Sequence, residues 1–281
     1  MPLPMFRESQ PKPTKSLHVL GIASGKGGVG KSTVTVNLAR ALKSLGYKVG
    51  VLDADIYGPS LKKMLPEDRM VGLKDQKFIP ALASGISLMS LAYFRQEDEA
   101  AIIRAPVANS LIQRFLKEVD WGELDVLLID FPPGTGDVQL TLSQQANLSG
   151  ALLVTTPQEI SIMDVKKSIH MFQQVSIPII GILENMSFYQ RGEEKIALFG
   201  REGGKRLAHL TGYPFLGEIP VEPGISECSD RGASLFEHYP QSLSAQLFLE
   251  KAQLIIQHLE ELRSIQQSCL QEFNLIWKEM H

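Results

Sequence analysis

The feature that most constrains this 281-residue chain is the run from Gly25 to Thr33, which reads Gly-Lys-Gly-Gly-Val-Gly-Lys-Ser-Thr. It matches the phosphate-loop pattern G-x-x-x-x-G-K-[ST], which belongs between a strand and a helix. The apolar stretch 17–23 and the three-to-four-residue spacing of apolar residues over 31–44 supply that context. Such a turn leaves backbone N–H groups at the helix start free for phosphate oxygens. The sequence therefore predicts a nucleotide site.

The residues of this loop have distinct expected roles. Its glycines permit positive φ angles and a close approach of the backbone to the phosphates. Lys31 is expected to reach the β- and γ-phosphates, and the Ser32 hydroxyl is expected to bind Mg²⁺. The predicted nucleotide-binding residues of the loop are Gly25, Lys26, Gly27, Gly28, Val29, Gly30, Lys31, Ser32 and Thr33.

Apolar runs alternate with helical patterns along the chain, which indicates an α/β fold with a mostly parallel β-sheet flanked by helices on both faces. Strands are expected at 17–24, 48–53, 86–91, 126–130, 151–155 and 179–183, with a short edge strand at 215–218. Helices are expected at 31–44, 106–119 and 160–174. The expected organisation is a flexible N-terminal tail over 1–15, a P-loop ATPase domain over 16–240 and a long C-terminal helical extension over 241–281.

Composition argues against several classes of function. The net charge of −3 gives no support to a nucleic-acid binder with a basic surface. No apolar run approaches the roughly 18 residues needed to span a bilayer, so no membrane partner is expected. Two cysteines form no disulfide framework, and the first 16 residues do not resemble a secretory signal. A reduced, cytoplasmic setting is the simplest expectation.

Acidic residues follow two of the predicted strands. Asp130 ends the apolar run 126–129, where α/β folds place their sites, and Mg²⁺ binding is its expected role. Asp53 and Asp55 follow the strand 48–53, and alternation puts both on one face, where they can orient Mg²⁺ or an attacking water. The Pro-Pro-Gly-Thr-Gly turn after Asp130 suits a phosphate-sensing switch. Asp137 either belongs to that switch or caps the next helix.

A second lysine, Lys26, lies inside the loop, and the run 26–33 resembles the deviant phosphate loop of the MinD/ParA/nitrogenase-iron-protein class of ATPases. The resemblance implies a homodimer that encloses ATP, with Lys26 reaching the partner's nucleotide. It also implies catalytic roles for Lys26, Lys31 and Asp55, with Asp55 orienting the water and Asp53 supporting Mg²⁺. Asn185 alone would indicate a turn residue, but the resemblance assigns it and Pro220 to the adenine.

Longer strings narrow this resemblance to the Mrp/ApbC branch of iron–sulfur cluster carrier ATPases. The matching strings lie at 53–60, 119–125, 130–141, 184–187 and 214–220. The resemblance covers roughly residues 16–240. It implies an ATP-hydrolysing homodimer that holds an iron–sulfur cluster and delivers it to client apoproteins.

One departure from that branch concerns the cluster itself. The branch carries a Cys-x-x-Cys pair a few residues after Asn185, and this chain has Arg191 and Glu194 at those positions. Neither side chain is a suitable ligand for a soft iron–sulfur centre. Cys228 remains as a candidate ligand, with an ordinary packed thiol as the alternative, and Cys269 is expected to pack. The departure keeps a second function open: a MinD/ParA-like switch that binds partner proteins without a cluster.

Overall fold

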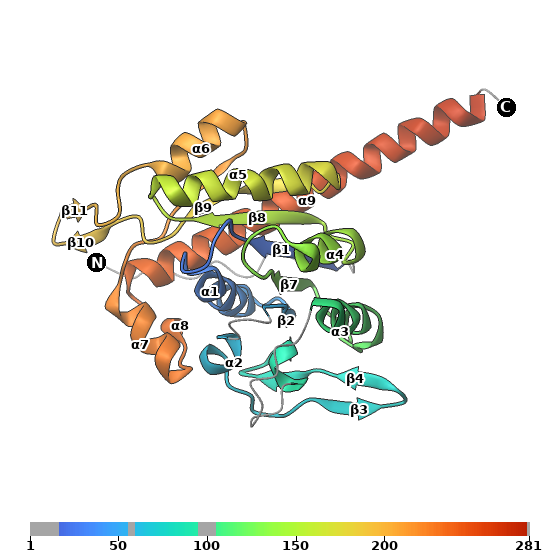
Figure 1. Cartoon of the computed structure of the whole chain (residues 1–281), viewed down its shortest axis with the longest axis horizontal. Helices are drawn as coiled ribbons and strands as arrows, with labels where there is room; N and C mark the ends of the chain where they lie inside the picture. Colours follow the sequence, from blue (N-terminus) through green and yellow to red (C-terminus); the bar gives the residue numbers. More distant parts are fainter. Residues whose placement is uncertain (1–16, 56–59, 95–104, 280–281) are drawn as a thin grey trace, which may run out of the picture.

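The computed structural model describes residues 17–55, 60–94 and 105–279, with side chains described over 17–55, 60–94 and 107–268. A central sheet contains β1 (His18–Ala23), β2 (Val49–Asp53), β5 (Ala81–Ala83), β6 (Ile86–Ser90), β7 (Val126–Asp130), β8 (Gly150–Thr155), β9 (Ile179–Glu184) and β12 (Phe215–Glu218). Their order is β12-β9-β8-β1-β7-β2-β6-β5 (Figure 1). All neighbours pair in parallel except β5 and β6, which form an antiparallel pair at one edge.

Helices cover both faces of this sheet. The first face is covered by α1 (Lys31–Ser44), α2 (Leu61–Met64), α7 (Pro223–Arg231), α8 (Leu235–His238) and the first part of α9 (Leu243–Glu279). The second face is covered by α3 (Ala105–Glu118), α4 (Asp137–Gln145), α5 (Glu159–Gln174) and α6 (Gly203–Thr211). Side chains alternate along β1: Leu20 joins the first core, whereas Val19 and Ala23 join the second. Burial on both sides explains why the strands read as continuous apolar runs.

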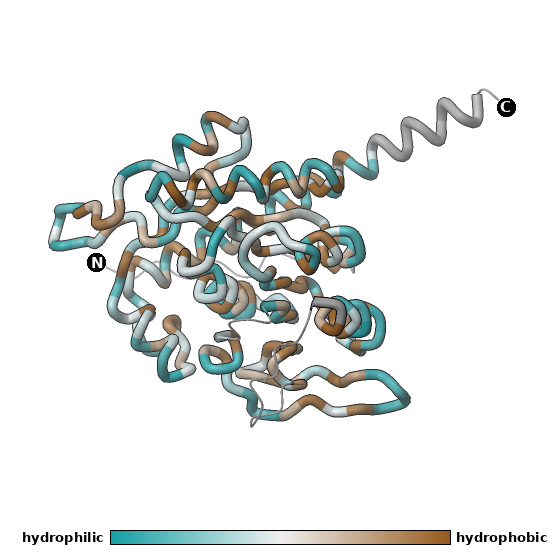
Figure 2. The backbone as a smooth tube through the Cα atoms, in the orientation of Figure 1, coloured by the Kyte–Doolittle hydropathy of each residue, from teal (hydrophilic) through white to brown (hydrophobic). Residues whose placement is uncertain are grey.

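Two small hairpins and one short helix complete the described structure. They are β3 (Gly72–Lys74) with β4 (Lys77–Ile79), β10 (Tyr189–Arg191) with β11 (Glu194–Ile196), and the 3₁₀ helix η1 (Leu91–Phe94). Both hairpins extend away from the body, and Figure 2 shows hydrophilic residues at their tips and hydrophobic residues along the central strands.

The long helix α9 packs on α1 through its first five turns. Its buried residues there are Ala245, Phe248, Ala252, Ile255, Ile256 and Leu259. Its C-terminal part extends beyond the edge of the sheet (Figure 1). Over the part of the chain that the structure describes, none of the helices combines the length and the apolar character that crossing a bilayer requires.

The predicted α/β fold is confirmed, and each strand and helix predicted between residues 17 and 218 lies within about a residue of its observed bounds. The long C-terminal helix begins at Leu243, two residues after the predicted start. No sequence pattern indicated β3, β4, β5, β10, β11, α2, α6, α7 or α8. These elements are short, and short segments carry too few residues for a hydrophobic period to be recognised. The tail over 1–15 lies outside the described residues, and the domain boundaries stay predictions.

Candidate functional site

The phosphate loop lies between β1 and α1, as the sequence predicts. Gly28 and Gly30 have φ angles of +80° and +79°, in the left-handed region that glycine adopts without strain. Gly30 occupies the N-cap position of α1, where no side chain caps the helix and no acidic residue lies in the first turn. The backbone N–H groups of that turn therefore form a site suited to an anion.

Two other glycines of the loop allow neighbouring segments to approach closely. A Cβ on Gly25 would lie 2.2 Å from the carbonyl carbon of Asp164 and 2.3 Å from the nitrogen of Val165, both in α5. A Cβ on Gly30 would lie 2.3 Å from Nδ2 of Asn185. These contacts leave no room for a side chain, so the glycines fix how the loop packs against the rest of the sheet.

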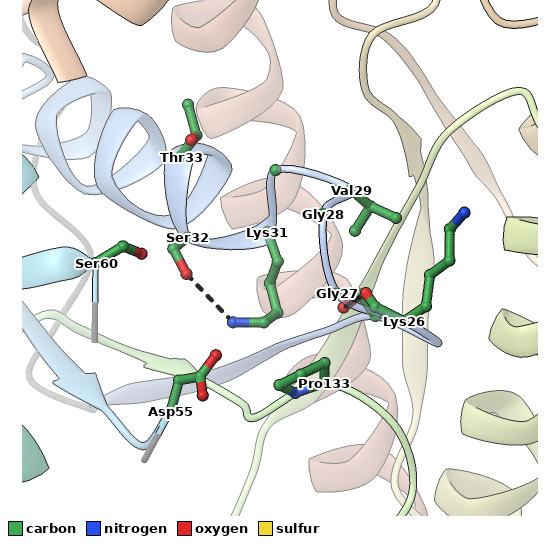
Figure 3. A pocket seen from close by; sticks show the side chains of 12 residues that line it. Lys26, Gly27, Gly28, Val29, Lys31, Ser32, Thr33, Asp55, Ser60 and Pro133 are labelled. Carbon is green, nitrogen blue, oxygen red and sulfur yellow. Dashed lines mark hydrogen bonds between the residues drawn. The ribbon is translucent and has the colours of Figure 1, made fainter. Parts of the chain in front are cut away.

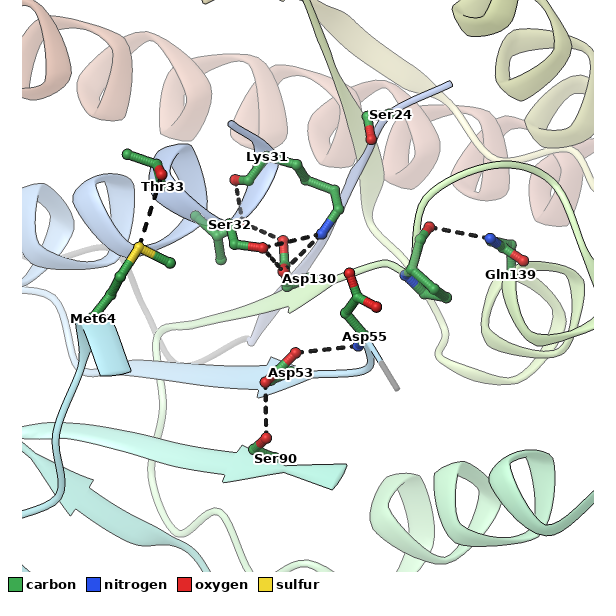
Figure 4. Close-up of polar contacts among 12 residues, drawn as sticks. Ser24, Lys31, Ser32, Thr33, Asp53, Asp55, Met64, Ser90, Asp130 and Gln139 are labelled. Carbon is green, nitrogen blue, oxygen red and sulfur yellow. Dashed lines mark hydrogen bonds and ion pairs between the residues drawn. The ribbon is translucent and has the colours of Figure 1, made fainter. Parts of the chain in front are cut away.

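The carboxylate of Asp130 is the centre of the polar site (Figure 4). Its Oδ2 lies 2.7 Å from Nζ of Lys31 and accepts a hydrogen bond of 2.7 Å from the Ser32 hydroxyl. β1 and β7 are neighbours with Ile22 paired to Asp130, and this register brings the strand end beneath the loop. Asp130 is fully buried, so the ion pair with Lys31 has little competition from solvent.

These groups fit a magnesium ion. Ser32 Oγ and Asp130 Oδ2 are hard oxygen ligands 2.7 Å apart, of the type that Mg²⁺ prefers. They would hold the ion, which supplies charge neutralisation at phosphate oxygens when it is bound.

Asp53 lies directly opposite Asp130 on the neighbouring strand β2 and is also fully buried. Its Oδ2 accepts a hydrogen bond of 2.8 Å from the Ser90 hydroxyl, and its Oδ1 accepts one of 3.1 Å from the backbone N–H of Asp55. Burial and the negative charge of Asp130 raise the pKa of Asp53 to about 7. Asp53 thus holds the chain where it leaves β2 toward Asp55.

A cleft of about 440 Å³ opens over the loop (Figure 3). It is lined by Ser24, Lys26, Gly27, Gly28, Val29, Gly30, Lys31, Ser32, Thr33, Asp55, Ser60 and Pro133. Most of the predicted nucleotide-binding residues, and Asp55, are therefore brought together in one cavity. The neighbouring segment 56–59, which the resemblance includes in its first matching string, lies outside the described residues.

Lys26 and Lys31 differ in direction. Figure 3 shows the Lys26 side chain extending away from Lys31, and its Nζ donates a hydrogen bond of 3.2 Å to Oε1 of Gln158. The side chains of the two loop lysines therefore extend to different parts of the cleft.

Asn185 and Pro220 are both buried and follow the neighbouring strands β9 and β12. The Asn185 side chain donates a hydrogen bond of 2.9 Å from Nδ2 to the backbone oxygen of Val29. Asn185 thus supports the phosphate loop directly, a contact that the sequence analysis did not foresee. The assignment of both residues to an adenine stays a prediction.

The segment after Asp130 contacts both the phosphate loop and α4. The backbone N–H of Gly134 donates to the oxygen of Ser24 at 3.2 Å, and Nε2 of Gln139 donates to the oxygens of Pro132 and Pro133 at 3.1 and 2.6 Å. Gly136 takes the N-cap position of α4, and Asp137 is its first helical residue. Asp137 therefore does not cap α4, and it lies where the turn ends.

The positions that carry cysteines in the Mrp/ApbC branch form the tip of the β10–β11 hairpin. Arg191 pairs with Glu194 across the strands, and Nη2 of Arg191 lies 3.0 Å from Oε2 of Glu194. Both side chains are exposed. An ion pair therefore occupies the two positions at which members of the Mrp/ApbC branch carry cysteines.

Cys228 lies in α7, packed in the core on the first face of the sheet, with 4% of its surface exposed. Burial raises the pKa of its thiol, which disfavours the thiolate form that binds metals. The structure thus supports the packed-thiol alternative and gives no support to Cys228 as a cluster ligand. The Cys269 side chain lies outside the described residues, and within them no group of three or more His, Cys, Asp or Glu side chains could hold a metal ion.

Two hydroxyl groups near the acidic residues escaped the sequence analysis. Thr35 donates a hydrogen bond of 2.7 Å to Oδ1 of Asp130, and Ser90 contacts Asp53 as described above. Both residues lie outside the phosphate-loop motif. Thr35 lies in α1 and Ser90 at the end of β6, and the sequence around neither residue indicates a function. Only the packing of α1 and β6 against β7 and β2 brings them to the site.

Comparisons with known proteins agree with this geometry. The family described as ParA, NUBPL iron-transfer P-loop NTPase, matches residues 15–256. The iron-sulfur cluster carrier protein of Aquifex aeolicus is 41% identical over 262 residues, which are 92% of this chain and 71% of that protein.

Solved structures show the same architecture. A nucleotide-binding protein from Archaeoglobus fulgidus in complex with ADP has a TM-score of 0.67 and 38% identity, covering 80% of this chain and 93% of that one. The septum site-determining protein MinD of Pyrococcus horikoshii, complexed with Mg-ADP, has a TM-score of 0.65 and 26% identity, covering 85% and 96%. Since the family match covers most of its length, this chain belongs to the NUBPL-type iron-transfer P-loop NTPases.

Proposed function

We propose that this chain binds and hydrolyses ATP as a nucleotide-gated homodimer and serves the delivery of iron–sulfur clusters to client apoproteins in the cytoplasm. The observation that carries the proposal is the shared contact of Lys31 and Ser32 with the buried Asp130, beside a cleft lined by the phosphate loop. P-loop NTPases use this set of an ammonium, a hydroxyl and a carboxylate to bind a nucleotide with Mg²⁺.

The residues of the cleft have different roles in hydrolysis. Lys31 and the loop N–H groups bind the phosphates and stabilise the charge that develops on them. Asp55 lines the cleft with 9% of its surface exposed and orients the attacking water. Asp53 supports this arrangement through its hydrogen bond to the Asp55 backbone.

The homodimer gives Lys26 its role. The Lys26 side chain extends away from Lys31, which supports a function toward the nucleotide of a second copy. Its hydrogen bond to Gln158 holds it at the rim of the cleft. A cation that reaches across in this way stabilises the transition state only when two copies meet.

Gating follows from the contacts of the Pro132–Gly136 turn. The N–H of Gly134 donates a hydrogen bond to the oxygen of Ser24, directly before the phosphate loop, and Gln139 of α4 donates to the oxygens of Pro132 and Pro133. A change in this turn on phosphate release therefore moves α4 relative to the loop, a known form of nucleotide switching.

The first experiment measures ATP turnover, nucleotide binding by calorimetry, and mass by light scattering with ATP and with ADP. The wild type is expected to hydrolyse ATP and to dimerise with ATP. Lys31→Ala is expected to lose nucleotide binding, whereas Lys26→Ala keeps binding and loses dimer-dependent turnover. A wild-type protein that binds ATP yet stays monomeric at every concentration would refute the homodimer.

A second candidate function is favoured by the charged hairpin tip. Arg191 and Glu194 form an ion pair and supply no thiolate, so a switch that binds partner proteins without a cluster also fits the site. Anaerobic reconstitution with iron and sulfide, followed by metal analysis, separates the two functions. Bound cluster supports the carrier, and a cluster-free ATPase that still binds client proteins supports the switch.

A further inference from the structure

Thr35 is a fully buried residue in the second turn of α1, one turn after the phosphate-loop lysine. Its hydroxyl lies 2.7 Å from Oδ1 of Asp130 and 3.1 Å from the backbone oxygen of Lys31. Thr35 contributes nothing to the lining of the nucleotide cleft. It therefore reaches the site only through Asp130.

A threonine hydroxyl has one proton and can donate it to one acceptor at a time. The carboxylate is the nearer acceptor of the two, and a hydrogen bond to a charged oxygen is roughly twice as strong as one to a neutral carbonyl. The proton of Thr35 thus points at Asp130. A threonine that only satisfied itself within its helix would donate to the carbonyl four residues earlier, as Thr211 does in α6.

The two oxygens of Asp130 consequently have different partners. Oδ1 accepts from Thr35, whereas Oδ2 contacts Lys31 and Ser32. The last side-chain torsion of an aspartate is intrinsically broad, so the carboxylate plane is not set by its own rotamer. The Thr35 hydroxyl, bonded to Oδ1, is therefore in a position to fix that plane.

We propose that Thr35 is a positioning residue, whose hydroxyl orients the Asp130 carboxylate so that Oδ2 faces Ser32 and is preset for Mg²⁺ with a bound nucleotide. The inference rests on the proposed function, because it concerns the same site. Residues that orient a metal-binding side chain typically change metal affinity by about 10- to 100-fold when they are replaced.

The test compares Thr35→Val, which keeps the shape and removes the hydroxyl, with Thr35→Ser, which keeps the hydroxyl. ADP binding is measured by calorimetry over a series of Mg²⁺ concentrations and in EDTA. Thr35→Val is expected to need about 10- to 100-fold more Mg²⁺ for half of the Mg²⁺-dependent gain in ADP affinity. ADP affinity in EDTA is expected to stay at the wild-type value, and Thr35→Ser is expected to restore the Mg²⁺ response.

Thr211→Val is the matched control, because it removes a hydroxyl that makes the same bond within its helix but contacts no carboxylate. It is expected to leave the Mg²⁺ response unchanged. Thermal melting of the nucleotide-free variants separates positioning from folding, and Thr35→Ala replaces Thr35→Val if the valine variant does not fold.

Two results would overturn the inference while leaving the proposed function intact. One is a wild-type Mg²⁺ response in the hydroxyl-free variant. The other is an equal loss of ADP affinity with and without Mg²⁺, which would assign Thr35 a purely structural role. If the wild-type protein itself binds no nucleotide, the proposed function fails and this inference fails with it.

Discussion

At the scale of residues, two buried carboxylates share one neighbourhood. Asp53 and Asp130 are register partners on adjacent strands, and Lys31 is the cation that contacts the pair through Asp130. Asp130 has donors on both oxygens, among them the Lys31 ammonium, whereas Asp53 has one hydroxyl and one backbone N–H. Burial and the neighbouring negative charge of Asp130 raise the pKa of Asp53, and the hydrogen bonds from Ser90 and Asp55 offset only part of that increase.

The raised pKa of Asp53 predicts a pH-dependent stability. Its folded pKa of about 7 lies above the ordinary value of 3.8, so the folded state binds the proton more tightly than the unfolded state does. Stability without Mg²⁺ or nucleotide should therefore increase as the pH falls from 8 toward 5. Thermal melting of the wild type and of Asp53→Asn measures this. The difference in melting temperature between the wild type and the variant should shrink at low pH. A difference that stays constant with pH would contradict a raised pKa at Asp53.

Replacing Asp55 with alanine tests the role of the cleft carboxylate. The variant should bind ATP as the wild type does, because its phosphate loop is unchanged. Turnover should fall by about 10²- to 10⁴-fold, the range for losing a group that orients or deprotonates a nucleophile. A phosphate-release assay beside an ATP-binding assay measures both, and turnover at the wild-type rate would remove Asp55 from the reaction.

At the scale of elements, the phosphate loop depends on the helix that packs against it. Gly25 touches the backbone of α5, and Asn185 after β9 holds the oxygen of Val29. The loop is thus supported by the helix α5 and by the end of the strand β9, both of which follow it by more than a hundred residues in the chain. Its conformation belongs to the assembled sheet as much as to the local sequence.

Gly25→Ala tests this packing. Its added Cβ would meet α5 backbone atoms at 2.2 and 2.3 Å, so the backbone must shift. Overpacking of this kind costs about 1–3 kcal/mol. Gly27→Ala is the matched control for stability, since nothing lies within 4 Å of its added Cβ. Chemical denaturation of both variants gives the comparison, and equal stability would show that α5 moves away without cost.

The β10–β11 hairpin allows a gain-of-function test. Arg191→Cys combined with Glu194→Cys places two thiols at facing positions of the hairpin. If two hairpins meet in the dimer, anaerobic reconstitution should yield a four-iron cluster, about four irons per dimer. The serine double variant removes the ion pair without adding thiols and should bind no iron. If the cysteine variant binds no iron under reducing conditions, the two hairpins do not meet in the dimer.

At the scale of the whole molecule, α9 closes one face of the sheet over the helix that follows the phosphate loop. Phe248 is fully buried there, whereas Ile265, farther along the same helix, is 59% exposed. The part of α9 before residue 260 therefore packs in the core on this face of the sheet, and the predicted boundary at 240 stays a prediction.

Phe248→Ala should lower the free energy of unfolding by about 3–5 kcal/mol, because it opens a cavity in a close-packed core. Ile265→Ala, on the exposed part of the same helix, should change it by about 0.5 kcal/mol or less. Urea denaturation of the two variants measures both values. Similar small effects would mean that α9 adds little to the stability of the body.

The sheet, the phosphate loop and the acidic residues at two strand ends could be predicted from the sequence, because each of these depends on a local period or a contiguous motif. The groups that complete the site depend on how distant segments pack together, which a local pattern does not encode. Thr35 contacts Asp130 and Ser90 contacts Asp53, and no local pattern marks either hydroxyl. The motif around Asn185 marks that residue, but not its hydrogen bond to Val29. The structure also places Cys228 in the core, which favours the packed-thiol alternative, since the burial of a thiol depends on the elements packed around it.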